Sequence, residues 1–153
     1  MQYILAAKSP SEGCVFCNKS QEADDAKNYV LLRGRTCFAL LNLYPYSNGH
    51  LMVAPYKHTA DFDLLTESEL AELLVLVRDC QKALRAAMHP DGFNVGVNLG
   101  KVAGAGITDH LHVHVVPRWN GDTSFMTVTG ETRVVPESLD ATYAKLKGAL
   151  TSQ

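Results

Sequence analysis

The hydrophobic and polar residues of this chain follow two different periods. Short runs rich in aliphatic and aromatic residues occupy positions 29–33, 37–42 and 50–55. Such runs predict strands, and the turn residues from Pro45 to Gly49 predict that the second and third strands form a hairpin. Pro55 closes the third run, because proline has no amide hydrogen to donate to a strand ladder.

From Thr66 onward the period becomes helical. Thr66 and Glu69 form the sequence pattern of a capping box, and Pro90 marks the expected end. Between them apolar residues recur at helical spacing, at Leu70, Leu73, Leu74, Val77, Cys80, Leu84 and Met88. This region is therefore predicted to be one long amphipathic helix.

The second half of the chain returns to strands. Residues 93–99 alternate as a strand, a glycine-rich loop spans 100–106, and residues 110–118 form a second strand of the same hairpin. The chain then reads as irregular from Asn120 to Pro136, and residues 136–150 predict a weaker helix with an apolar stripe at Leu139, Tyr143, Leu146 and Leu150. This order of elements predicts an antiparallel α+β fold rather than alternating βαβ units.

Length and composition fit one domain spanning residues 1–153. A hydrophobic content of 46% is enough to form one core, whereas residues 1–30 are polar and predict a loop-rich segment. No apolar run approaches the roughly 18 to 20 residues of a membrane helix, and residues 1–8 lack a signal-peptide pattern. We therefore expect a cytoplasmic protein that has no membrane partner.

Net charge limits the ligands. At −2 it gives no general attraction for a nucleic-acid duplex. An anionic ligand such as a nucleotide would instead be held by local groups, of which Arg118, Lys101 and oriented backbone amides are examples.

The four cysteines divide into two kinds. Cys14 and Cys17 form a Cys-x-x-Cys pair, whereas Cys37 and Cys80 stand alone inside apolar runs and are predicted to be core residues. In a cytoplasmic protein this spacing argues against a disulfide framework.

Three histidines alternate with apolar residues near the end of the second hairpin. In an extended segment His110, His112 and His114 share one face, while Leu111 and Val113 face the other side. Histidines at positions i, i+2 and i+4 are not an expected accident of core or surface packing. The histidine face therefore indicates chemistry.

A metal site and a nucleophilic site are the two readings of this face. His110 and His114 would lie roughly 13 Å apart along a strand, so all three imidazoles cannot easily converge on one zinc ion, although two could. Alternatively, His112 attacks an electrophilic phosphorus while its two neighbours stabilise the phosphate oxygens. The strand spacing leaves room for a phosphoryl group.

The motif from His110 to Val116 resembles that of the histidine triad (HIT) superfamily. The segments 38–42 and 48–53 are similar to the nucleoside-binding hairpin of that family, and the resemblance runs from about Cys14 to Arg118. Residues 117–122 resemble the fragile-histidine-triad branch and, more closely, bacterial diadenosine tetraphosphate phosphorylases.

The resemblance implies a fold and a reaction. The fold would be a HIT-like antiparallel sheet of about five strands with one long and one C-terminal helix, the latter within a C-terminal extension over residues 131–153. Two chains would form a homodimer with one larger sheet. The reaction would cleave dinucleoside polyphosphates at the α-phosphate. A nucleotidyl-His112 intermediate would be resolved by phosphate or water, with His114 contacting the phosphate and His110 orienting the cluster.

The resemblance also implies nucleotide contacts. Asn42 would bind the ribose. Asn98 is a candidate for a second polar contact near the phosphates, and the alternative is that it only caps a turn. Trp119 fits the phosphorylase-like group, and the alternative is that it is only a packing aromatic. Small residues of the preceding loop would offer backbone amides to the polyphosphate, at Gly104, Ala105, Gly106 and Ile107. Many relatives have glutamine near Gly106, and some phosphorylases have serine. This chain has neither, which leaves phosphorolysis and hydrolysis both open.

A structural zinc ion is a further implication of the resemblance. Cys14 and Cys17 would be joined by His58 and His110, a ligand set that suits a closed tetrahedral site. The alternative for the pair is two metal-free thiols. His50 reads as a structural residue rather than a catalytic one, and His89 as a cation at a helix end.

Two other functions stay open at this stage. One is an adenosine phosphoramidate hydrolase, since the same covalent step serves a nitrogen leaving group. The other is a nucleotide-binding zinc protein without useful turnover.

Overall fold

The computed structural model describes residues 13–123, 130 and 135–151, and its centre is a single antiparallel sheet. Five strands lie in the order β1-β2-β3-β5-β4. Their bounds are β1 Val30–Arg33, β2 Cys37–Leu41, β3 Leu51–Pro55, β4 Gly92–Val97 and β5 Val113–Arg118. Both predicted hairpins, β2 with β3 and β4 with β5, are therefore confirmed, as is the α+β class.

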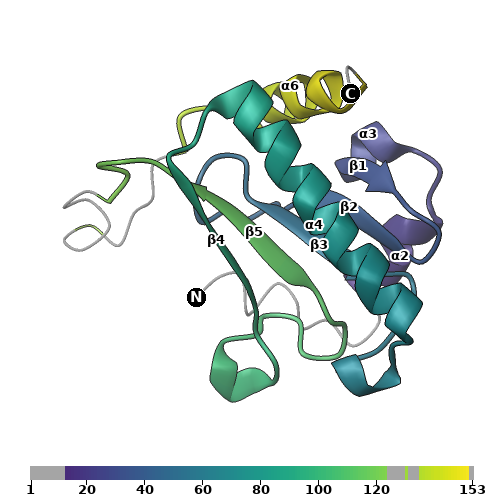
Figure 1. Ribbon diagram of the computed structural model, residues 1–153. Helices are drawn as coiled ribbons and strands as arrows, with labels where there is room; N and C mark the ends of the chain where they lie inside the picture. Colours follow the sequence, from purple (N-terminus) through teal and green to yellow (C-terminus); the bar gives the residue numbers. More distant parts are fainter. Residues whose placement is uncertain (1–12, 124–129, 131–134, 152–153) are drawn as a thin grey trace.

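Helices cover both faces of the sheet unequally. Helix α4, Glu67–Met88, crosses one face, and helix α6, Leu139–Thr151, lies beside its C-terminal end (Figure 1). The main core lies between α4, α6 and the sheet and includes the predicted core residues Cys37 and Cys80. A second, smaller core forms on the opposite face, where Phe16 packs on Phe38, Leu40 and Met52.

Local signals account for helix α4. The side chain of Thr66 accepts a hydrogen bond from the amide of Glu69, whose carboxylate accepts one from the amide of Thr66, which completes the capping box. His89 ends the helix with a left-handed conformation, φ 50°. The helix is therefore confirmed within one or two residues of the expected ends.

The expectation that residues 1–30 have little regular structure is wrong for the described part of that segment. Residues 15–21 form helix α2, Val15–Gln21, and residues 25–28 form helix α3, Asp25–Asn28. Helix α2 packs against the sheet through Phe16, whose side chain is fully buried. Residues 1–12 lie outside the described part.

The start of the histidine strand is also corrected. Strand β5 begins at Val113, so His110 and His112 precede it and only His114 lies within it. Two hydrogen bonds outside the strand ladder fix the segment before β5. The amide of Leu111 donates to the carbonyl of Thr59 (2.6 Å), and Nε2 of His110 lies 2.9 Å from the carbonyl oxygen of Pro55. The alternation still holds, since Leu111, Val113 and Val115 belong to the core under α4.

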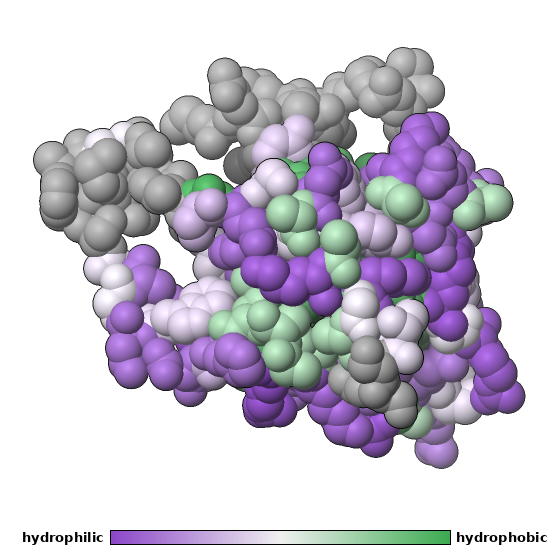
Figure 2. Space-filling model, turned by 90° about the horizontal axis from the view of Figure 1, so that it is seen from above, coloured by the Kyte–Doolittle hydropathy of each residue, from purple (hydrophilic) through white to green (hydrophobic). Residues whose placement is uncertain are grey.

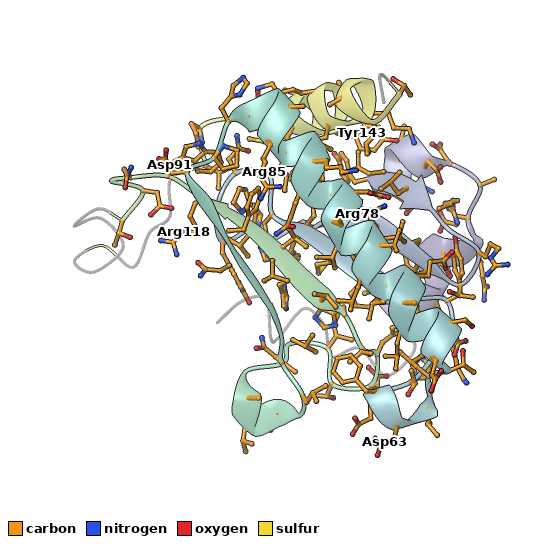
Figure 3. The ribbon with its side chains drawn as sticks, in the orientation of Figure 1. Asp63, Arg78, Arg85, Asp91, Arg118 and Tyr143 are labelled. Carbon is orange, nitrogen blue, oxygen red and sulfur yellow. The ribbon has the colours of Figure 1, made fainter. Side chains whose placement is uncertain are left out.

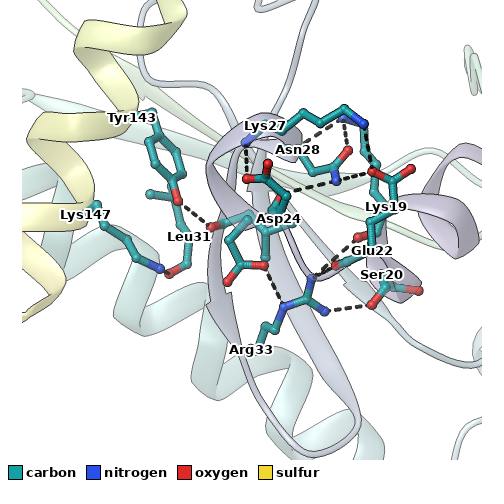
Figure 4. A network of polar contacts seen from close by, with 12 residues as sticks. Lys19, Ser20, Glu22, Asp24, Lys27, Asn28, Leu31, Arg33, Tyr143 and Lys147 are labelled. Carbon is teal, nitrogen blue, oxygen red and sulfur yellow. Dashed lines mark hydrogen bonds and ion pairs between the residues drawn. The ribbon is translucent and has the colours of Figure 1, made fainter.

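Helix α2 is fastened at its C-terminal end by Arg33 (Figure 4). The guanidinium donates to the carboxylate of Asp25 (2.8 Å) and to the carbonyls of Ser20 (2.7 Å) and Glu22 (2.8 Å). Carbonyls at a helix end have no partner within the helix, so Arg33 satisfies them. Helix α2 is thus tied to strand β1, which places Phe16 over the sheet.

Other side chains close the edges of the fold. Tyr143 of α6 donates to the carbonyl of Val30, and Lys147 donates to that of Leu31, which covers the free edge of β1 (Figure 4). Seen from above the view of Figure 1, the surface is mainly hydrophilic, with paler hydrophobic side chains near its centre (Figure 2). No helix among the described residues has the length and apolar character that crossing a bilayer requires.

Candidate functional site

His112 has one ring nitrogen engaged and the other available. Its Nδ1 lies 2.8 Å from the carbonyl oxygen of His110. A carbonyl can only accept, so Nδ1 carries the proton and donates. In the neutral ring Nε2 then bears the lone pair. This is the tautomer that a nucleophilic imidazole requires.

A second chain of hydrogen bonds defines His114. The backbone amide of Tyr46 donates to Nδ1 of His50 (3.0 Å), so the proton of neutral His50 is on Nε2. That nitrogen lies 2.9 Å from Nδ1 of His114 and donates to it. The remaining proton of His114 is therefore on Nε2. The arrangement gives His114 a donor with which to bind a phosphate oxygen beside His112, whose ring centroid is 4.8 Å away.

Desolvation keeps these imidazoles neutral. It lowers the pKa of His112 below its ordinary 6.5, although the hydrogen bond to the His110 carbonyl acts in the opposite direction. Burial, together with the neighbouring His112, lowers the pKa of His114 to about 4. At neutral pH His112 is therefore unprotonated, as an attacking nitrogen must be.

Cys14, Cys17, His58 and His110 come together as one cluster. Their ligand atoms, two Sγ and two ring nitrogens, all lie within 4.8 Å of one another. Nδ1 of His110 is 3.2 Å from Sγ of Cys14 and 3.6 Å from Sγ of Cys17, and Nδ1 of His58 is 3.4 Å from Sγ of Cys17. The cluster ties helix α2 to the segment that follows β3 and to the start of the histidine motif.

The donor chemistry of this cluster fits zinc. Sulfur and nitrogen ligands on one tetrahedral zinc ion lie roughly 3.5 Å apart, which matches the observed separations. Since Nε2 of His110 lies 2.9 Å from the Pro55 carbonyl, its Nδ1 carries the lone pair that a metal needs. Desolvation and the adjacent Cys14 raise the pKa of Cys17 to about 11, so this thiol would lose its proton at neutral pH only beside a cation.

A small cavity of about 190 Å³ lies over strands β2 and β3 on the face that carries helix α2. Its lining is mostly apolar, from Val15, Phe16, Lys19, Leu40, Leu41, Asn42, Leu43, Tyr44, Met52 and Ile107. Asn42 is buried, and its Oδ1 accepts from the amide of Tyr44 (2.9 Å). An apolar cavity with a few placed polar groups is the usual form of a small-molecule site.

A larger cavity of about 670 Å³ adjoins His114 on the other side. Asn98 and Trp119, both predicted nucleotide contacts, line it, together with Tyr46 and Arg118. Arg118 stands where β5 ends, and its carbonyl accepts from the amide of Asp91, the residue before β4 (Figure 3). The two cavities therefore separate the predicted contacts: Asn42 and Ile107 lie in one, and Asn98 and Trp119 in the other.

The glycine-rich loop forms a turn of its own. The amide of Gly104 donates to the carbonyl of Lys101 (3.1 Å), and that of Ala105 to Gly100 (3.4 Å), within and just after the short helix Lys101–Ala103. These two amides are engaged in the turn rather than open to a ligand. Gly104, Ala105 and Gly106 are not among the described residues that line the two cavities, whereas Ile107 lines the smaller one.

Sequence reasoning underestimated three neighbours of the triad. The ring of Phe16 packs at 5.0 Å from that of His110 and at 4.9 Å from that of His112, and the ring of Tyr46 stacks on His114 at 5.7 Å. His50, read as structural, is fully buried and holds His114. The sequence does contain a signal for the role of Phe16. This residue lies between Cys14 and Cys17, which the resemblance brings to His110, so Phe16 is expected near the triad as well.

Comparisons with known proteins agree with this geometry. A model of the HIT domain matches residues 23–121. The chain belongs to the HIT family. It is 45% identical over 118 residues to a Mycobacterium tuberculosis protein named AP-4-A phosphorylase, a match that covers 77% of this chain and 60% of that protein. The HIT chain therefore spans less than two thirds of the length of that relative. An uncharacterized HIT-like protein of Saccharolobus solfataricus is 32% identical over 74% of the chain and 79% of its own length.

Solved structures of HIT proteins have the same fold. A zinc-bound histidine triad family protein from Mycobacterium smegmatis aligns with a TM-score of 0.74 at 30% identity, covering 92% of this chain and 94% of the other. A hypothetical histidine triad nucleotide-binding protein from Sulfolobus tokodaii aligns with a TM-score of 0.72 at 28% identity, over 91% and 93%. The predicted HIT-like sheet is thus confirmed.

Proposed function

We propose that this HIT protein cleaves dinucleoside polyphosphates such as diadenosine tetraphosphate through a covalent nucleotidyl-His112 intermediate. The observation that carries the proposal is the tautomer of His112. Nδ1 donates to the His110 carbonyl at 2.8 Å, which leaves Nε2 unprotonated on the active face. The similarity to a protein named AP-4-A phosphorylase supports the choice of substrate class.

The first step transfers a nucleotidyl group to the protein. Nε2 of His112 forms a bond to the α-phosphorus while the bond from phosphorus to the polyphosphate oxygen breaks, and ATP departs with the bonding electrons. The ring gains positive charge as Nε2 is substituted, and the hydrogen bond from Nδ1 to the carbonyl of His110 stabilises that charge. His114 donates from Nε2 to a phosphate oxygen, and Asn42 binds the ribose in the smaller cavity.

The second step frees the nucleotide. An oxygen of inorganic phosphate, or water, attacks the phosphorus, and the electrons of the nitrogen–phosphorus bond return to His112. Phosphate yields ADP and water yields AMP. Asn98 and Trp119, in the larger cavity beside His114, are the described side chains that we assign to the acceptor and phosphate side.

Zinc completes the proposed site as a structural ion. Cys14, Cys17, His58 and His110 would hold it, and its chemistry there is to fix four ligands in a closed tetrahedral site. The zinc-bound relative supports this assignment. Held by the ion, His110 presents its backbone carbonyl to His112, and helix α2 keeps Phe16 against the triad.

The chain is further proposed to act as a homodimer whose sheets join at β4. Among the described residues this strand is one edge of the sheet, so its outer backbone groups have no strand partner there. Val95 and Leu99 are 45% and 40% exposed at this edge, and Leu74 of α4 is 65% exposed. An unpaired edge next to exposed aliphatic side chains suits an isologous interface.

Product analysis tests the proposed reaction. Pure protein is incubated with diadenosine tetraphosphate, with and without phosphate, and the nucleotides are separated. ADP and ATP that appear only with phosphate indicate phosphorolysis, whereas AMP and ATP indicate hydrolysis. No cleavage of this compound, with cleavage of an adenosine phosphoramidate, would transfer the proposal to that substrate class, and no cleavage of either would leave a nucleotide-binding protein.

A variant separates catalysis from binding. His112→Ala is expected to remove turnover while the fold and the affinity for AMP remain, because the smaller cavity does not depend on that side chain. Unchanged turnover in this variant would refute the nucleophile assignment.

A further inference from the structure

The strand register places the two cavities side by side over one row of residues. Leu40 pairs with Met52, Met52 pairs with His114, and His114 pairs with Gly96. These four positions cross β2, β3, β5 and β4, a distance of roughly 14 Å at the usual strand spacing. Leu40 and Met52 line the smaller cavity, and His114 and Gly96 line the larger one. The row therefore runs from one cavity, past the triad, to the other.

Position on this row assigns a direction to the substrate. A phosphorus atom held at His112 and His114 would have its own nucleoside over Leu40 and Met52. The group on the far side of the bond that breaks would lie over Gly96. This strand position has no side chain, and no heavy atom lies within 4 Å of where its Cβ would be, so a bound molecule can approach the β4 backbone closely.

The size of the larger cavity suits a large departing group. At about 670 Å³ it has more than three times the volume of the smaller cavity, about 190 Å³. Ammonia or a simple amine would leave most of that space empty. A nucleoside with its phosphates is of the size that cavities of this volume bind.

The chemistry of the lining favours a nucleoside at the end away from His114. At that end Trp119 offers an aromatic ring, and Asn94, which pairs with Val116 two positions beyond His114, offers an amide. Arg118 is already neutralised, since it donates from Nε and Nη2 to Asp122 (2.6 and 2.8 Å) and from Nη1 to Asn94 (2.7 Å). An ion pair next to an amide and an aromatic ring suits an uncharged base and ribose better than additional phosphate.

We propose that the larger cavity binds the departing nucleotide, with its nucleoside between β4 and Trp119, and that this subsite makes the protein prefer dinucleoside polyphosphates to nucleotidyl esters or amides with small leaving groups. The inference rests on the proposed function, because there is a departing nucleotide only if His112 attacks the α-phosphate.

Filling the floor of the cavity tests the subsite. Gly96→Val places a side chain in the space above β4, and Gly96→Ala is a milder variant if the larger one lowers stability. Gly92→Val is the matched control, because Gly92 lies on the same strand, has equally open space above it and is outside the lining. The measured quantity is kcat/KM for diadenosine tetraphosphate divided by that for adenosine 5′-phosphoramidate.

The expected result is a fall in this ratio of about tenfold or more in Gly96→Val, a smaller fall in Gly96→Ala and no change in Gly92→Val. An unchanged ratio in both Gly96 variants would overturn the subsite while the proposed reaction stands. Parallel loss of both activities would also overturn it, since the substitution would then act on His114 rather than on the leaving group.

A binding measurement keeps the inference testable without turnover. ATP is titrated by calorimetry into protein saturated with AMP, which occupies the smaller cavity. The expectation is that ATP binds beside AMP in the natural protein and in Gly92→Val, and more weakly in Gly96→Val. ATP that only displaces AMP would overturn the subsite, and so would the absence of binding by either nucleotide. Binding of both without any cleavage would preserve the subsite and refute the reaction.

Discussion

Removing the imidazole of His50 should slow catalysis without abolishing it. His50 is fully buried, accepts from the amide of Tyr46 and donates to Nδ1 of His114. In His50→Ala both partners lose a buried hydrogen bond, each at a cost of about 1–3 kcal/mol. The share that falls on His114 affects the rate, because the ring is then free to adopt the other tautomer. We expect kcat to fall roughly 5- to 150-fold.

The conservative variant distinguishes positioning from packing. In His50→Gln the side chain keeps one acceptor and one donor, so it should recover part of the lost kcat with little change in KM. His89→Asn is the control, since His89 caps α4 outside the site and asparagine tolerates its φ of 50°. Steady-state kinetics on diadenosine tetraphosphate provide the measurement. Full activity in His50→Ala, or no recovery in His50→Gln, would refute the role deduced from the hydrogen bonds.

Three further outcomes follow from the same structure. Desolvation lowers the pKa of His112 below 6.5 and that of His114 to about 4, so both imidazoles stay neutral as the pH falls. We therefore expect kcat/KM to stay near its plateau at pH 6, and a fall in kcat/KM centred at or above about pH 6.5 would contradict this. Removal of metal by a strong chelator should lower the melting temperature, and zinc should restore it, whereas Cys80→Ser should retain the metal on elemental analysis and Cys17→Ser should lose it. Glu72→Gln should lower the free energy of unfolding by about 1–3 kcal/mol, because the carboxylate accepts from the amides of Arg35, Thr36 and Cys37, while Glu67→Gln at the start of the same helix should change it little. The stabilisation by the Glu72 carboxylate is full above pH 4.5 and is lost as the pH falls through its lowered pKa of about 2. Denaturant unfolding measured at a series of pH values would detect this loss.

Elements with local signals could be predicted from sequence. Helix α4 has its start in Thr66 and Glu69 and its stripe along one face, so its bounds needed no tertiary information. Helix α2 has no side-chain cap and is only seven residues long, and the burial of Phe16 against the sheet stabilises it. A polar segment of this kind reads as loop until its packing partner is known.

The different roles of His110, His112 and His114 depend on contacts between segments that are distant in the sequence. The placement of β3 beside β5, which brings His50 to His114, is not evident from two hairpins alone. The late start of β5 at Val113 likewise depends on the carbonyls of Pro55 and Thr59, which form hydrogen bonds with His110 and Leu111 in place of the strand ladder. The zinc ligand set, in contrast, came from resemblance, and the structure brings all four residues together.

Direct observation of the covalent intermediate tests the central claim. The protein is mixed with diadenosine tetraphosphate in the absence of phosphate, quenched under alkaline denaturing conditions that preserve a phosphorus–nitrogen bond, and analysed intact and after digestion by mass spectrometry. The account predicts an adenylyl adduct that maps to His112 and is absent from His112→Ala. Cleavage that proceeds without any adduct, or an adduct on another residue, would contradict it.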